Sequence, residues 1–496
     1  MEFQFQNKPL RSMRQVAWET KNEEQTLEIR ITEDMPPVDK ILAAWGQPVI
    51  RSKDWNGDQA VVSGGVMAWV LYDAQNGAGP QKVEGWIPFQ FKWDLKDSDR
   101  DGVFQTQWLL RSIDARLTGA GKLMVRASVS ALGEGLEETN YDFYVPGELP
   151  KDVQVLKERI DICIPAEAGE KVMQLDEEMV LPPGRGEIDQ VLAYQLRPVV
   201  TEKKLMSDKF VFRGTAKLQA VYLCTDGRIH SYETDIPISQ YTQLEQEYSP
   251  EAWLRLIPEV SELELEKTDP TRLRLKGAVV GQYSVWEKQK VEAVTDAYSN
   301  RRHVEMQITC VSFPALIADE TIEQTVCCHV PASVTDAVAY NMWMGQPIVK
   351  GGEMEPSAYL EGSGQVLYYE DGNLCAESKM WDDGVALSGK NRLQPVMYIQ
   401  GYPVLKADAD GIGLSQDISI LAADICDTEL KVVSGVTLGD LQKPDPSRPS
   451  LVLCSAGDKS LWQLAKECGS TVDLICKAND LEEKPEPNKI LVIPVE

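Results

Sequence analysis

The residue types that most often carry out catalysis are sparse in this sequence of 496 residues. Histidine occurs only at His230, His303 and His329, and the ten cysteines are scattered without a CxxC pair. An enzyme needs a nucleophile or base, an orienting group and a stabilising group in one site, and no segment shows that combination. We therefore predict that the protein is not an enzyme and has no cofactor and no metal site.

Motifs that resemble metal or nucleotide sites have simpler structural explanations. The stretch "CCHV" (327–330) places two cysteines beside a histidine, but successive strand residues face opposite sides and rarely converge on one ion. "GSGQVL" and "GIGLSQ" lack the strand and helix context of a nucleotide-binding loop, so we assign their glycines to turns. Acidic pairs such as Glu137-Glu138 are expected to be solvated, because adjacency does not identify catalytic carboxylates.

The charge of the chain argues against anionic partners. Lys and Arg total 50 against 77 Asp and Glu, a formal net charge of −27. Such a surface repels phosphate backbones and anionic membranes, so we expect no nucleic acid as a partner. Residues 1–25 have no apolar core of a signal peptide, and no 18-residue apolar stretch predicts membrane insertion. We expect a cytoplasmic protein with reduced thiols.

Internal repetition dominates the organisation of the chain. "GQPVI" (46–50) recurs as "GQPIV" (345–349). A shift of 150 positions aligns residues 39–72 with residues 189–222 without a gap, and ten of these thirty-four positions are identical. A gap-free match of this length indicates a true repeat.

We predict three units at 1–150, 151–305 and 306–442, the third being degenerate. Within them, "QAVVSGGVMAWVLYD" and "KFVFRGTAKLQAVYLCTDG" alternate apolar with polar or small residues, which is the period of a strand. Asp-Gly pairs mark hairpin turns. The predicted fold class is mainly β, with three tandem β-sandwich-like repeat domains.

Helical signals are fewer in these units, and the two short segments 39–46 and 249–260 are the candidate helices. Pro48, Pro198 and Pro347 occupy corresponding positions in the three units. We expect each of these prolines at a corner where the chain enters its first long strand, since proline cannot donate to a central ladder.

The last fifty residues have a different pattern. The proline-rich stretch 443–449 is a predicted linker. In 450–496, "SLVLCSAGD" indicates a strand and turn, and "SLWQLAKECG" has the apolar spacing of one helix face. "STVDLICKAND" offers Ser470 or Thr471 as the N-cap of a second helix, and "NKILVIPV" is a closing strand. The predicted order is βααβ, a small α+β domain.

Residues 450–495 resemble a LysM domain in "GD", "LW", "LA", "TV", "LI", "AN" and the end "LVIP". The three upstream units resemble the SPOCS repeat of endospore-forming bacteria in the order "PPVDKIL", "GQPVI", "G", "Y", "IPF" and in the end piece "DAYS". The resemblance implies that two loops of the LysM domain form the binding face. The candidate binding residues on them are Gly457, Asp458, Ser460, Leu461, Trp462, Asn479, Asp480, Leu481 and Glu482.

Tandem SPOCS units followed by a LysM domain resemble the arrangement of spore-coat morphogenetic proteins. That likeness implies a scaffold in the mother-cell cytoplasm at the forespore surface, with the LysM domain docking the spore-coat morphogenetic ATPase of the basement layer or another coat protein. LysM domains more usually bind N-acetylglucosamine glycans such as peptidoglycan or chitin. Glycan binding is therefore the alternative function.

Several residues bear on this choice. A typical LysM loop has "GDTLW", whereas this chain has the longer "GDKSLW" (457–462), and Cys454 stands where an aromatic or polar residue is common. Both departures weaken the case for glycan binding and leave protein docking open, and the missing export signal also counts against glycan binding. Trp462 could stack on a sugar, or it could pack into the core beside Leu461.

Overall fold

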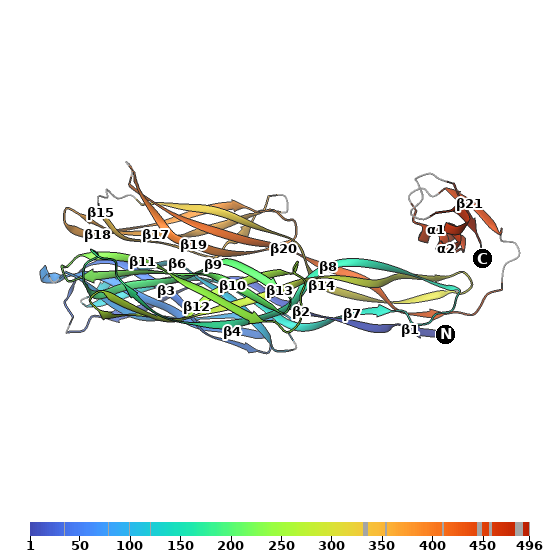
Figure 1. Cartoon of the computed structure of the whole chain (residues 1–496), viewed down its shortest axis with the longest axis horizontal. Helices are drawn as coiled ribbons and strands as arrows, with labels where there is room; N and C mark the ends of the chain where they lie inside the picture. The colour runs from blue at the N-terminus through green and yellow to red at the C-terminus, as the bar shows by residue number, and fades with distance from the viewer. Residues whose placement is uncertain are drawn as a thin grey trace.

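The computed structural model describes residues 1–33, 35–77, 79–98, 100–119, 121–330, 336–352, 355–408, 411–443, 449–455, 459–481 and 490–495. The predicted fold class is confirmed, because long strands make up almost all of it. They run along an elongated body, and two short helices lie at one end, near the N-terminus (Figure 1). Among the described residues, no helix is long and apolar enough to cross a membrane.

The first unit contains two three-stranded antiparallel sheets. One sheet has the order β2 (Gln6–Arg30), β7 (Lys122–Val145) and β6 (Gly102–Gly119). The other has the order β3 (Val38–Asn56), β4 (Gln59–Ala74) and β5 (Gly79–Asp94), with the 3-10 turn η1 (Gln75–Gly77) before β5. The sheets face each other, with β3 on β6 and β2 on β5. This packing makes the unit a β-sandwich.

The second unit repeats this plan. Its sheets are β12 (Trp253–Asp269), β13 (Arg272–Ser299) and β8 (Val153–Val180), and β11 (Ile229–Gln243), β10 (Lys209–Cys224) and β9 (Ile188–Met206).

The third unit also has two antiparallel sheets, but one of its strands is interrupted. One sheet pairs β14 (Val304–Val330) and β19 (Arg392–Asp408) with β20 (Gly411–Leu438). The other pairs β15 (Asp336–Met344), β16 (Ile348–Lys350) and β18 (Asn373–Ala386) with β17 (Ser357–Glu370). The N-terminal strand β1 (Glu2–Gln4) pairs with β20, so the start of the chain completes the sheet of the third unit.

The three units close into a ring. β3 of the first unit packs on β12 of the second, β9 of the second on β19 of the third, and β15 of the third on β6 of the first. The largest hydrophobic core runs through the first two units and includes Ala339, Trp343 and Leu367 of the third. Because the units share this core, each repeat is stabilised by its neighbours.

The repeated pentapeptide lies where the units meet. Gln195 Nε2 donates to the Gly46 carbonyl at 2.8 Å, and Gln47 Oε1 accepts the Leu196 N–H at 2.9 Å. In the third unit, Gln346 Nε2 donates to the Gln107 carbonyl of the first unit at 3.0 Å. These buried amides satisfy backbone groups across the unit boundaries, so the repeat is a packing element of the ring.

Two expectations about local structure are wrong. Residues 39–46 and 249–260 lie in or beside β3 and β12, and no helix forms there. The reason is burial of both strand faces, as in the unbroken buried run 254–260, which removes the alternation that distinguishes a strand from a buried helix.

The prediction that each of the three prolines lies at a corner before a strand is also wrong in two of the three units. Pro48 and Pro198 lie inside β3 and β9, each an edge strand of its sheet, where a missing N–H breaks no ladder on the open side. Only Pro347 lies at a break between strands, the one between β15 and β16. By contrast, "CCHV" behaves as the strand prediction requires, with Cys327 exposed and Cys328 buried.

Beyond the ring, three strand pairs continue side by side as a narrower stalk, namely the outer parts of β2–β7, β8–β13 and β14–β20 (Figure 1). Aromatic and branched side chains from all three pairs fill its centre. They include Tyr141, Phe143, Ile162, Ile164, Val291, Val311 and Phe313. The stalk thus carries its own hydrophobic core away from the ring toward the helical end of the molecule.

Candidate docking surface

The tail module, residues 450–496, contains the strands and helices predicted for it. β21 (Leu451–Ser455) pairs antiparallel with β22 (Ile490–Pro494), and helices α1 (Leu461–Cys468) and α2 (Val472–Asn479) lie between them in the sequence. The fully buried side chains of its small core are Leu464, Ala465, Ile475, Leu491 and Ile493.

The helix starts follow from their capping residues. Ser460 caps α1 in a capping box, in which its hydroxyl accepts the Gln463 N–H and the Gln463 side chain accepts the Ser460 N–H. Thr471 caps α2 by accepting the Leu474 N–H at 3.2 Å, which decides between the two predicted caps. Capping therefore uses the Ser460 side chain, one of the candidate binding residues.

Several other candidate binding residues have structural roles. The Asn479 amide donates to the Val492 carbonyl at 2.6 Å and accepts the Val492 N–H at 2.7 Å, which ties α2 to β22. Asp480 ends α2 in the left-handed conformation, and Leu461 and Leu481 pack against the tail core. Gly457, Asp458 and Glu482 lie outside the described residues, so the two predicted loops are described only in part.

Trp462 contacts the stalk. Its indole Nε1 donates to Asp296 Oδ2 at 2.8 Å, and its ring meets that of Tyr298 edge to face with centroids 4.8 Å apart. Lys466, one turn along α1, donates to both Asp296 oxygens at 2.7 and 2.8 Å. The Tyr298 hydroxyl donates to the Ser470 carbonyl at 2.9 Å. We call these five residues the latch, and they fasten the tail module to the end of β13.

The latch changes the acidity of its carboxylate. Burial raises the pKa of Asp296, but the hydrogen bonds from Lys466 and Trp462 outweigh burial and hold the pKa below its ordinary value. The ionised form is thus the one that the docked tail module stabilises. The tail side of the latch consists of the Trp462 and Lys466 side chains and the Ser470 carbonyl, so Trp462 is committed to a contact within the protein.

The face of the tail sheet that points away from the tail core is apolar and exposed. Leu451, Leu453 and Ile490 are 58%, 71% and 67% exposed. The register places Leu453 opposite Val492 and Leu451 opposite Pro494, so all five side chains lie on one face of the two-stranded sheet. We call them the outer face. An apolar patch of this kind on a small module is typical of a protein-binding surface.

The sequence contains a signal for the outer face that the motif comparison overlooked. "LVLC" (451–454) is apolar at four successive positions. A two-stranded sheet covered by helices on one side only needs apolar residues on alternate positions. The extra leucines therefore have no core to fill.

A groove of about 1140 Å³ lies between the first and second units. Burial lowers the pKa of Lys53 there, although Glu170 beside it opposes the shift, and burial raises the pKa of Glu259 well above its ordinary value. Lys53 Nζ donates to Gln282 at 2.8 Å. The Nζ of the equivalent Lys203 donates to the Leu254 carbonyl at 2.6 Å. Because the lysine at this position is hydrogen-bonded within the protein in both repeats, we assign it to the packing of the strands.

One comparison with known proteins assigns part of the chain to a protein family. Residues 187–266 match the family described as SipL, SPOCS domain. The match covers β9, β10, β11 and most of β12, and it does not reach the tail module. It supports a likeness of the second unit to the SipL family. No curated protein and no solved structure matches the chain.

Proposed function

We propose that this chain is a non-enzymatic scaffold of spore-coat assembly, acting in the mother cell at the forespore surface. In this proposal the ring and stalk are a rigid platform, and the tail module docks a protein of the coat basement layer. The match of residues 187–266 to the SPOCS domain supports the place of action. The outer face of the tail module is the observation that carries the docking role.

The chemistry of the outer face favours a protein over a sugar. Its side chains are aliphatic, whereas glycans are bound by aromatic stacking and by convergent polar groups. Trp462, the aromatic residue predicted for stacking, is bonded to Asp296 and packed on Tyr298. A partner with a complementary apolar patch and a polar rim would bury the exposed leucines.

A binding measurement with one charged substitution tests this proposal. Leu453→Asp places a carboxylate in the middle of the outer face, where docking would bury it unpaired. We expect the affinity for the purified basement-layer ATPase to fall at least about tenfold, or about 1.4 kcal/mol. Titration calorimetry with the full-length chain provides the measurement.

The matched control is Ile317→Asp. Ile317 is 58% exposed on β14, so the same charge enters a similarly exposed apolar site far from the tail module. We expect wild-type affinity for this variant. If Leu453→Asp binds as tightly as the wild type while circular dichroism shows an intact fold, docking through the outer face is wrong.

A further inference from the structure

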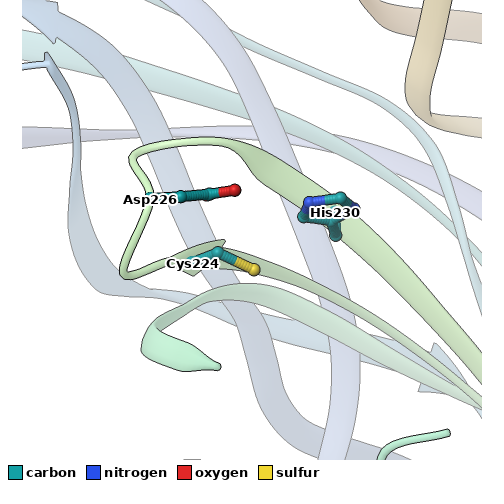
Figure 2. Close-up of side chains that lie close together, drawn as sticks. All are labelled: Cys224, Asp226 and His230. Atoms are coloured by element: carbon teal, nitrogen blue, oxygen red, sulfur yellow. The ribbon is translucent and has the colours of Figure 1, made fainter. Parts of the chain in front are cut away.

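Three side chains of different ligand types converge at the turn between β10 and β11. A sulfur of Cys224, a carboxylate oxygen of Asp226 and a ring nitrogen of His230 all lie within 4.8 Å of one another. Figure 2 shows the three side chains around the same small space, with Cys224 before the turn, Asp226 in it and His230 after it. Cys224 is buried, His230 is half-buried and Asp226 is exposed.

The local strand geometry explains why these groups meet. His230 pairs with Tyr222 across the hairpin, and Cys224 lies two residues beyond Tyr222 on the same face. The ring of His230 lies beside that of Tyr222, with centroids 6.0 Å apart and an angle of 29° between the ring planes. Asp226 Oδ1 accepts the Arg228 N–H at 3.0 Å and is thereby held in the turn. Cys224 Sγ lies 3.5 Å from the Arg185 carbonyl.

The repeats show that this set is not required by the fold. Tyr72 of the first unit corresponds to Tyr222, and both hydroxyls donate to a backbone carbonyl of the preceding segment, at 3.1 and 3.0 Å. Two residues further on, the first unit has Ala74 where the second has Cys224. The same hairpin therefore folds without the thiol.

We propose that Cys224, Asp226 and His230 form a binding site for one zinc ion. Sulfur, imidazole nitrogen and carboxylate oxygen are the three ligand types that zinc accepts. In a tetrahedral site with bonds of about 2.0–2.3 Å, ligand atoms lie about 3.5 Å apart. The three groups need only a modest contraction to reach that spacing, and the exposed turn at Asp226 allows it. A water molecule would supply the fourth ligand.

The position of the site suggests a structural role for the ion. Ile229, next to His230, donates its N–H to the Tyr369 hydroxyl of the third unit at 3.2 Å. An ion that links both strands at the hairpin end would stiffen the segment that makes this contact. The zinc site would thus strengthen the junction between the second and third units.

Cobalt substitution tests the site directly. The chelator-treated full-length chain is titrated with Co²⁺, and thiolate-to-cobalt absorption is recorded, followed by competition with Zn²⁺. We expect one ion per chain, and Cys224→Ala should remove the thiolate absorption. His230→Ala and Asp226→Asn should each weaken Zn²⁺ binding by about 100-fold or more, since loss of even an outer partner costs 10–100-fold.

The control is Cys328→Ala, which removes a buried thiol elsewhere in the chain and should leave the absorption unchanged. Cys224→Ala copies the first unit, so circular dichroism should show a native fold. The proposal is overturned if no thiolate absorption appears, or if it persists in Cys224→Ala. Zn²⁺ binding of wild-type strength in His230→Ala would also contradict it.

Discussion

At the scale of single residues, the latch decides how the tail module sits on the platform. Asp296 receives three hydrogen bonds from Trp462 and Lys466, and Tyr298 packs on the Trp462 ring. The first unit offers an internal comparison, because its end piece places Asp142 and Tyr144 in the same order without a tail module. Asp142 instead accepts from Asn7 at 2.9 Å. The latch is therefore a specialisation of the second unit.

Asp296→Ala should release the tail module from the stalk. The substitution removes the acceptor for both tail side chains, and hydrogen bonds to a charged group contribute about 1.5–3 kcal/mol each. We expect the released fraction to rise at least about tenfold, visible by small-angle X-ray scattering as a longer and more flexible particle. Asp142→Ala should leave the scattering unchanged, and equal scattering of the Asp296 variant and the wild type would refute the latch.

Acid should have the same effect on the wild-type chain. The pKa of Asp296 is lowered in the docked state, so the latch is fully formed above the ordinary carboxyl pKa of about 4. It weakens as the pH falls through the lowered value. Asp296→Asn should lose this pH dependence.

At the scale of elements, each unit has a glycine at the point where the second strand of one sheet lies closest to the first strand of that sheet. A β-carbon on Gly64, Gly214 or Gly362 would lie 2.3, 2.0 or 2.0 Å from a backbone carbonyl oxygen of the adjacent strand. This close approach explains the identity of Gly64 and Gly214 in the repeat alignment. Backbone cannot move aside as a flexible side chain can.

Gly214→Ala should therefore destabilise the second unit. Forcing β9 and β10 apart costs about 1–3 kcal/mol by the usual penalty for overpacking, and urea unfolding would show the loss. Gly384→Ala is the control, because no atom lies within 4 Å of its added β-carbon. Equal midpoints for the two variants would contradict the steric explanation.

Much at this scale was predictable from the sequence. Alternation identified the long strands, and apolar spacing with capping residues located α1 and α2. The sequence pattern did not identify the strands at 39–46 and 249–260, because a strand buried on both faces no longer alternates apolar with polar residues. The proposed zinc ligands were overlooked because only the register of the hairpin brings Cys224 and His230 together.

At the scale of the whole molecule, three repeats form one ring and stalk. The alignment predicted the repeats but not their closure, which depends on side chains such as Gln195 that reach between units. Nor could it show that the second unit receives the tail module, since Asp296 and Trp462 are 166 positions apart. Repeats that share a core are expected to unfold together, whereas the tail module has its own small core.

Removal of the tail module separates the docking surface from the ring and stalk. Among the described residues, only Tyr298 of the platform belongs to the tail core. We therefore expect a chain of residues 1–442 to keep its melting temperature within about 2 °C.

The decisive measurement is capture of the purified basement-layer ATPase by the full-length chain and by residues 1–442, with peptidoglycan and chitin as parallel baits. We expect the full-length chain to capture the ATPase and not the glycans, and the truncated chain to remain folded and capture neither. Capture of the ATPase at full strength by residues 1–442 would contradict docking through the tail module.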